Sequence, residues 1–141
     1  MMKMSWFILA LIAMVFFGLM TLTQKHLLNL GIRPIIFAMY IEGIIFLLLL
    51  IASVATKQDL KIPSLWLVFL ILAAVLGMVG LLMSTYSLKQ TPNAGYSSAV
   101  ISASAIVVFI GSVLLFKSEF SYIKVAGVVL ATIGIILIGW K

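Results

Sequence analysis

The sequence predicts an all-α membrane protein with five transmembrane helices, and two observations lead to this fold class. Hydrophobic residues fill 65% of the 141 positions, charged residues fill 9%, and the mean hydropathy is +1.37. Soluble domains hold roughly 45–50% apolar and about 25% charged residues. The apolar residues also form five runs, each near the roughly 20 residues that a helix needs to cross the hydrocarbon core. The chain is therefore expected in the cell (plasma or inner) membrane as a multi-pass protein.

The five runs follow one another with short polar connections. They cover residues 4–22, 35–55, 65–88, 94–116 and 122–140. The first run exceeds the roughly 7–15 apolar residues of a signal peptide and has no small-residue cleavage site, so it is expected to be a retained helix. The second begins after Arg33-Pro34, and proline suits the first turn of a helix. Because the connections leave no room for a soluble domain, residues 1–141 are expected to form one membrane-embedded domain.

The charge and the polar residues exclude several classes of function. The net charge is +6, but the basic residues stand mostly at helix ends, where they meet lipid headgroups. The bilayer is therefore the expected partner, and no nucleic acid is needed to explain the charge. The chain has no cysteine, and His26 stands beside Lys25 without metal-ligating neighbours. No catalytic or phosphate-binding motif is present, so we expect no enzyme, no metal and no cofactor.

The basic residues are almost evenly divided between the two sides of the membrane. Five helices place Lys3, Lys57, Lys61, Lys117 and Lys124 on the side of the N-terminus, which makes five. Lys25, Arg33, Lys89 and Lys141 fall on the other side, which makes four. The positive-inside rule therefore gives little preference. Two interpretations stay open: a weak preference for the N-terminus inside, or insertion in both orientations with antiparallel pairing of the chain with itself.

Glu42 is the only acidic residue inside a predicted helix. It lies seven residues past Ile35, about 10 Å along the axis, within a hydrocarbon core about 30 Å thick. A charge at such depth is costly, so it should face the bundle, a cavity or a partner. It is either a proton- or cation-binding group of a transport path, or a structural group that is ion-paired with Lys25 or Lys89 or hydrogen-bonded in its protonated form. Tyr40 is also deep, but two positions away it falls on the opposite face.

Small residues form stripes at helical spacing on the last three predicted helices. These stripes include Gly77 and Gly80, then Gly95, then Gly127, Ala131 and Gly134. In membranes such stripes let helix backbones approach closely, so packing is their expected role. The alternative is that polar side chains beside them line a substrate path. The candidates for that path are Glu42, Tyr40, Lys25, Ser84, Tyr86, Tyr96, Ser98 and Ser102.

The order of several short motifs resembles one five-helix repeat of the drug/metabolite transporter superfamily, of the EamA type. The matching residues are Phe17-Gly18, Lys25, Gly31 to Pro34, Ser87-Leu88, Thr91, Glu119, Ser121, Gly127, Leu130 and Gly134. There are departures as well: the family's fourth-helix proline is absent near Ile106, Ser118 replaces the glycine of the turn, and no arginine stands near Ile41. Because this proline is missing, the resemblance does not imply a kink in the fourth helix.

The resemblance implies a secondary transporter, expected to export small metabolites or drug-like compounds by alternating access. Full-length members resemble two fused repeats, the second inverted. This chain resembles one half, so it is expected to pair with an antiparallel second copy or with a homologous half. One alternative is a lipid-linked sugar flippase or small multidrug exporter of the four-helix type. The fifth helix and the lack of a first-helix carboxylate count against it. The other alternative is a non-transporting scaffold subunit.

Overall fold

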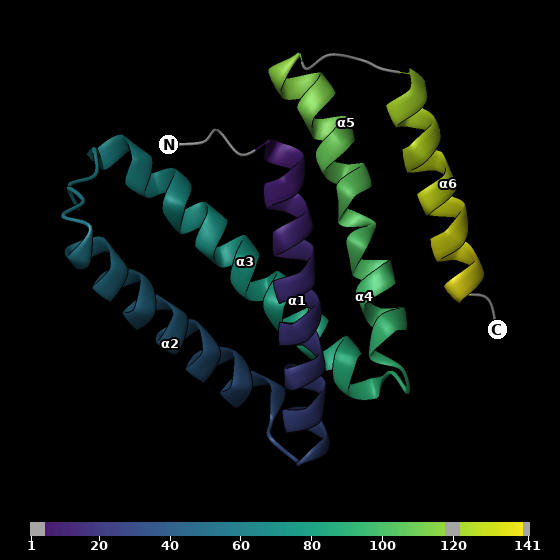
Figure 1. The fold of residues 1–141 in the computed structure, drawn as a ribbon, viewed down its shortest axis with the longest axis horizontal. Helices are drawn as coiled ribbons and strands as arrows, with labels where there is room; N and C mark the ends of the chain where they lie inside the picture. The colour runs from purple at the N-terminus through teal and green to yellow at the C-terminus, as the bar shows by residue number, and fades with distance from the viewer. Residues whose placement is uncertain (1–4, 118–121, 140–141) are drawn as a thin grey trace. The chain divides into compact units, whose positions relative to one another are not determined.

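A computed structural model describes residues 5–117 and 122–139, and within these ranges every regular element is an α-helix. The chain divides into two compact units, Met1–Gln90 and Thr91–Lys141, and each is described by itself (Figure 1). The predicted turn residues Ser118, Glu119 and Ser121 and both predicted ends, 4 and 140, lie outside the described residues. The all-α fold class is confirmed by the described part of the chain.

In the first unit, α1 (Trp6–Asn29) continues well beyond the predicted end at residue 22. The hydroxyls of Thr21 and Thr23 donate to the carbonyls of Phe17 and Leu19, at 2.9 and 3.0 Å. These side chains therefore bond to their own helix and do not end it. The polar residues that follow the predicted end of the helix instead form its last two turns.

A tight turn joins α1 to α2 (Pro34–Ala55). The N–H of Gly31 donates to the carbonyl of Leu28 at 3.2 Å, and the N–H of Ile32 donates to that of Leu27 at 3.4 Å. This pair of bonds is the Schellman motif, which satisfies carbonyls at a helix C-terminus. Pro34 then occupies the first turn of α2, where its missing N–H costs nothing. The Gly-x-x-Pro spacing thus ends one helix and starts the next.

Replacing Gly31 by alanine is expected to lower the free energy of unfolding by about 1–2 kcal/mol. Gly31 has φ +101°, outside the left-handed region near +50 to +70° that other residues can occupy. Lys57 ends α2 in the same kind of turn, but at φ 54°, inside that region. Chemical or thermal unfolding in detergent measures the loss. Gly18→Ala, within α1 and free of neighbours for an added Cβ, is the control, and an equal loss in both variants would contradict this account.

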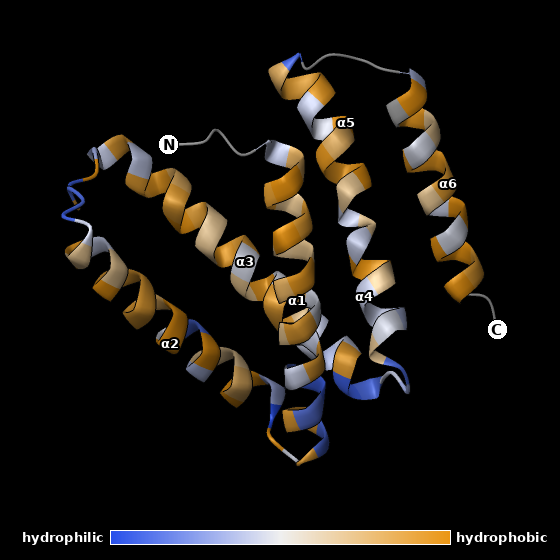
Figure 2. Cartoon of the chain, viewed as in Figure 1, coloured by the Kyte–Doolittle hydropathy of each residue, from blue (hydrophilic) through white to orange (hydrophobic). Residues whose placement is uncertain are grey.

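The third helix, α3 (Ser64–Gln90), packs against both α1 and α2. The buried side chains of this unit gather where α1 ends, α2 begins and α3 ends, and hydrophilic residues surround the same place (Figure 2). They are Gln24, Leu28, Pro34, Phe37, Ala38, Thr85 and Leu88. The opposite ends of the three helices carry no buried residue among those described. The unit is thus held together mainly at one end.

In the second unit, the predicted fourth helix is interrupted at Ala103, which separates α4 (Ala94–Ser102) from α5 (Ser104–Phe116). The N–H of Ala103 bonds to the carbonyl of Val100 at 3.1 Å, and the N–H of Ile106 to that of Ala103 at 2.9 Å. These i to i−3 bonds are a short 3₁₀ step. The Ser102 hydroxyl also donates to the Ser98 carbonyl at 2.9 Å, a bond that often bends helices. The irregularity is therefore present without a proline.

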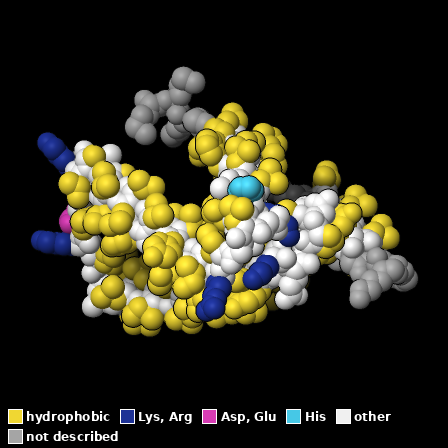
Figure 3. Space-filling model, turned by 90° about the horizontal axis from the view of Figure 1, so that it is seen from below, with side chains coloured by type: hydrophobic (Ala, Val, Ile, Leu, Met, Phe, Trp, Pro, Cys, Tyr) yellow, Lys and Arg dark blue, Asp and Glu magenta, His cyan; other side chains and the backbone are white. Residues whose placement is uncertain are grey.

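The last helix, α6 (Tyr122–Gly139), packs against α4 and α5. Among the described residues, four stretches are long and apolar enough to cross a membrane: α1, α2, α3 and the combined Ala94–Phe116. The apolar part of α6, Val125–Ile138, is shorter. Large apolar side chains stay exposed along all of these helices, and Figure 3 shows them over most of the visible face. Such a surface suits a bilayer, where backbone groups are satisfied within each helix and apolar side chains face lipid.

Candidate functional site

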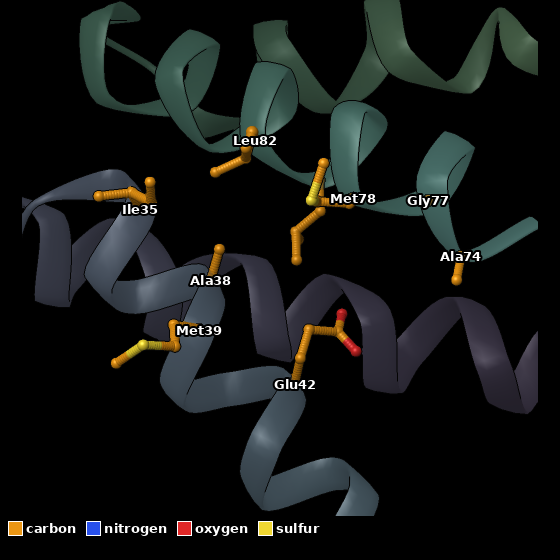
Figure 4. A pocket seen from close by; sticks show the side chains of 9 residues that line it. Ile35, Ala38, Met39, Glu42, Ala74, Gly77, Met78 and Leu82 are labelled. Carbon is orange, nitrogen blue, oxygen red and sulfur yellow. The ribbon is translucent and has the colours of Figure 1, made fainter. Parts of the chain in front are cut away.

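A cavity of about 630 Å³ lies between α2 and α3. It is lined by Ile35, Ala38, Met39 and Glu42 from α2 and by Ala74, Gly77, Met78, Leu81 and Leu82 from α3. Figure 4 shows Ala38 and Glu42 directed toward α3, with Met78 and Leu82 on the facing side. Its volume lies within the roughly 300–1,000 Å³ of ligand pockets. Among the described residues of the lining, Glu42 is the only one whose side chain carries a hydrogen-bonding or charged group.

The Glu42 carboxylate is placed at membrane depth by its position in α2. It stands eight residues past Pro34, about 12 Å along the helix axis. Glu42 forms no ion pair with Lys25 or Lys89, which was one alternative from the sequence. Within the described ranges, Glu42 takes part in no hydrogen bond or ion pair. The carboxylate is exposed toward the cavity. It is therefore accessible to an ion, a proton or a ligand.

Lys25 is engaged elsewhere. Its Nζ donates to the carbonyl oxygen of Leu88 at 2.9 Å, and the side chain is half-buried. Leu88 lies in the last turn of α3, where carbonyls lack partners within the helix and the helix dipole favours a positive charge. Lys25 does not line the cavity of Glu42. Its position indicates that it fixes the end of α3 against α1.

Gln24 and Thr85 form a buried hydrogen bond that the sequence did not single out. Gln24 Nε2 donates to Thr85 Oγ1 at 2.8 Å, and Thr85 Oγ1 donates to the Leu81 carbonyl at 2.7 Å. Gln24 is 5% exposed and Thr85 is fully buried. Leaving a buried polar group without its partner costs about 1–3 kcal/mol. The pair therefore fixes the register of α1 on α3, and a glutamine within the last turns of α1 was its only signal in the sequence.

Replacing Thr85 by valine, which keeps the shape of the side chain, is expected to lower the free energy of unfolding by about 1–2 kcal/mol. Gln24 would then remain buried without an acceptor. Thermal unfolding in detergent or nanodiscs checks this. The matched control is Thr23→Val, because the one described hydrogen bond of the Thr23 hydroxyl is to the Leu19 carbonyl of its own helix. If both variants lose the same stability, the interhelical bond contributes nothing of its own.

The remaining predicted path residues of the first unit lie away from the cavity. Tyr40 and Tyr86 are exposed, and neither lines it. The Ser84 hydroxyl donates to the Leu81 carbonyl of its own helix at 2.9 Å. Of the five path residues predicted in this unit, the structure places only Glu42 on the cavity wall. The grouping of these residues along one path stays a prediction.

The second unit holds a cavity of about 560 Å³ between α6 and the interrupted helix. The stripe residues Gly127, Ala131 and Gly134 line it from α6, and Ser102 lines it from α4. Tyr96 is exposed and Ser98 half-exposed, and neither belongs to this lining. The wall is otherwise apolar, so this cavity offers a ligand less chemistry than the first.

The predicted packing glycines show no close helix contact within the described chain. A Cβ built at Gly77, Gly80, Gly127 or Gly134 would meet no atom within 4 Å. Gly95 has a local role instead: its N–H donates to Asn93 Oδ1 at 2.8 Å, which caps the start of α4. Close packing through these stripes therefore stays a prediction. Gly77 opens onto the cavity of Glu42, where its lack of a side chain adds to the free volume.

The comparison with known protein families agrees with the membrane-spanning helices. The chain matches the EamA-like transporter family over residues 4–140, which includes both units and all six helices. No curated protein and no solved structure matches it. A match over nearly the whole chain implies a membrane transporter of small molecules. The chain belongs to the EamA-like transporter family.

Proposed function

We propose that the protein is a secondary transporter that exports small molecules, with the cavity between α2 and α3 as part of its binding site. The observation that carries this proposal is the Glu42 carboxylate, unpaired among the described residues, on the wall of an apolar cavity at membrane depth. Ionisable groups inside membrane-spanning segments mark substrate and ion pathways, because the free-energy cost of a charge in the bilayer makes such groups rare outside functional sites. Glu42 would bind a proton or a cationic group of the substrate in turn.

The transporting unit would be a dimer of such chains. If α6 also crosses the membrane, each chain has an odd number of spans, so an antiparallel pair reproduces the inverted repeats around which alternating access is built. The nearly even distribution of basic residues, five against four, is compatible with such a pair. A second copy is therefore the partner we propose. A homologous half is the alternative, and the orientation of the wild-type chain in the membrane distinguishes the two.

Other predicted path residues would act at the wall of the assembled path. Tyr40, Ser84 and Tyr86 of the first unit and Tyr96, Ser98 and Ser102 of the second would shape it around the substrate. Lys25 is not part of this proposed wall, because its Nζ donates a hydrogen bond to the Leu88 carbonyl.

Transport by the purified protein tests the proposal without a known substrate. Proteoliposomes with an imposed pH gradient would be incubated with a mixture of small amines, amino acids, sugars and aromatic compounds. Mass spectrometry of the lumen would then be compared with protein-free liposomes, which account for passive entry. We expect at least one compound to accumulate only with protein and only with the gradient. Folded, dimeric protein that moves no compound of the mixture would favour a scaffold function, and movement of labelled lipid-linked sugar alone would favour a flippase.

A further inference from the structure

We infer that the cavity between α2 and α3 selects monovalent organic cations with an apolar body and no second polar group. This inference rests on the proposed function, because it names the substrate class of the same site. It is carried by the composition of the wall, which is one carboxylate among seven apolar residues and one glycine. The charge, the apolar body and the size of the ligand each follow from a separate feature of the cavity.

The charge of the ligand follows from Glu42. Its carboxylate has no ion-pair partner within the described residues, and the lining supplies no basic side chain. In a medium of low dielectric constant, an unpaired carboxylate is stabilised by a cation in contact with it. An anion would be repelled at the same place. The ligand therefore carries one positive charge beside Glu42, and a second charge would have no partner in the lining.

The apolar body follows from the rest of the wall. Ala38, Met39, Met78 and Leu82 supply aliphatic and thioether surfaces and no hydrogen-bonding side chain. A hydroxyl or carboxylate on the body of the ligand would lose its water without gaining a partner, which opposes binding. The two methionines are flexible and polarizable, so they can adapt to bodies of different shape. The cavity thus discriminates against zwitterions such as amino acids and against sugars, but tolerates variety among apolar cations.

The size of the ligand is limited by the cavity and by Gly77. The volume of about 630 Å³ holds a body with one or more aromatic rings. Gly77 lies on the wall, and a Cβ at this position would meet no atom within 4 Å. A side chain at position 77 can therefore start without a clash, and its further atoms would take up space that the ligand needs.

Equilibrium binding with three matched probes tests the inference. Phenethyltrimethylammonium is a permanent cation, phenylalanine betaine is the same molecule with an added carboxylate, and hydrocinnamate carries the phenethyl body on an anion. Each labelled probe would be dialysed against the full chain in phosphatidylcholine nanodiscs, with empty nanodiscs as the blank. We expect the cation to bind at least about tenfold more tightly than the zwitterion or the anion, the ratio typical for a contact to a charged group.

Three variants connect the selectivity to the cavity. Glu42→Gln should weaken binding of the cation by about tenfold or more. Asp59→Asn removes an exposed carboxylate outside the cavity and should leave binding unchanged. Gly77→Leu should abolish binding while the unfolding temperature is unchanged or raised, because leucine favours a helix over glycine. The last variant separates a filled cavity from a misfolded chain.

The outcomes distinguish this inference from the proposed function. Equal binding of the cation to the wild type and Glu42→Gln, or betaine binding as tight as that of the cation, would overturn the inference. If the proteoliposomes still transported a compound in that case, the proposed function would stand with another substrate class. If the cation bound as expected but nothing crossed the membrane, the site would stand and the transport function would fail.

Discussion

Glu42→Gln is expected to reduce gradient-driven transport roughly ten- to hundredfold, the kinetic equivalent of losing one interaction with a charged group. The amide has nearly the shape of the carboxylate but can neither take up a proton nor attract a cation. Because Glu42 is the only ionisable residue in the described wall of its cavity, no neighbouring group of that lining can replace it. Initial rates in proteoliposomes with a pH gradient measure the effect.

Asp59→Asn is the matched control, because it removes a carboxylate from the exposed loop between α2 and α3. Its transport rate should equal that of the wild type. The unfolding temperature of Glu42→Gln should not fall, since no described hydrogen bond or ion pair depends on the carboxylate. Full transport by this variant at every pH would remove Glu42 from the mechanism.

Shifting the balance of basic residues is expected to fix the orientation of the chain and to abolish transport by either fixed form alone. Arg33→Gln with Lys89→Gln leaves five basic residues on the side of the N-terminus and two on the other. Lys57→Gln and Lys61→Gln with Gln90→Lys gives three and five. By the positive-inside rule, the first set directs the N-terminus inward and the second outward. Reporters at both termini measure the orientation.

Co-expression of the two fixed forms tests directly whether the active unit is an antiparallel pair. If the active unit is an antiparallel pair, the two fixed forms should each be inactive, and together they should restore transport close to the wild-type rate. The altered residues lie outside the cavity lining, so the loss cannot be assigned to the binding site. Activity of one fixed form expressed alone would contradict an antiparallel homodimer. A single orientation of the wild type would point instead to a homologous partner.

The membrane-spanning runs and the turn between α1 and α2 could be predicted from the sequence. Runs of apolar residues long enough to cross a bilayer have few alternatives, because backbone groups in lipid must be satisfied within a helix. Gly31 and Pro34 are also local signals, since each acts through its own backbone geometry. For the same reason Glu42 was identifiable: one carboxylate within an apolar run needs no tertiary structure to be noticed.

The contacts between helices could not be predicted, because they depend on which residues meet across the fold. Gln24 and Thr85 are separated by 61 positions, and the local sequence around either residue does not indicate that the other is its partner. The predicted end of the first helix was wrong for a related reason. Polar residues at the end of an apolar run predict its boundary, whereas here Gln24 is buried against α3. The step at Ala103 has no local marker either, because it arises without a proline.

The hydrogen bond between Lys25 and Leu88 has a consequence for biosynthesis. Its acceptor follows its donor by 63 residues, which a ribosome adds in roughly 3 to 13 seconds. During that interval the Leu88 carbonyl has not yet been made, so Lys25, like Arg33, contributes its charge to the orientation of the first two helices. Once α3 is in place, Nζ is bound to a carbonyl and the side chain is half-buried. The charge that guides insertion of the nascent chain is thus partly withdrawn from the surface of the finished protein.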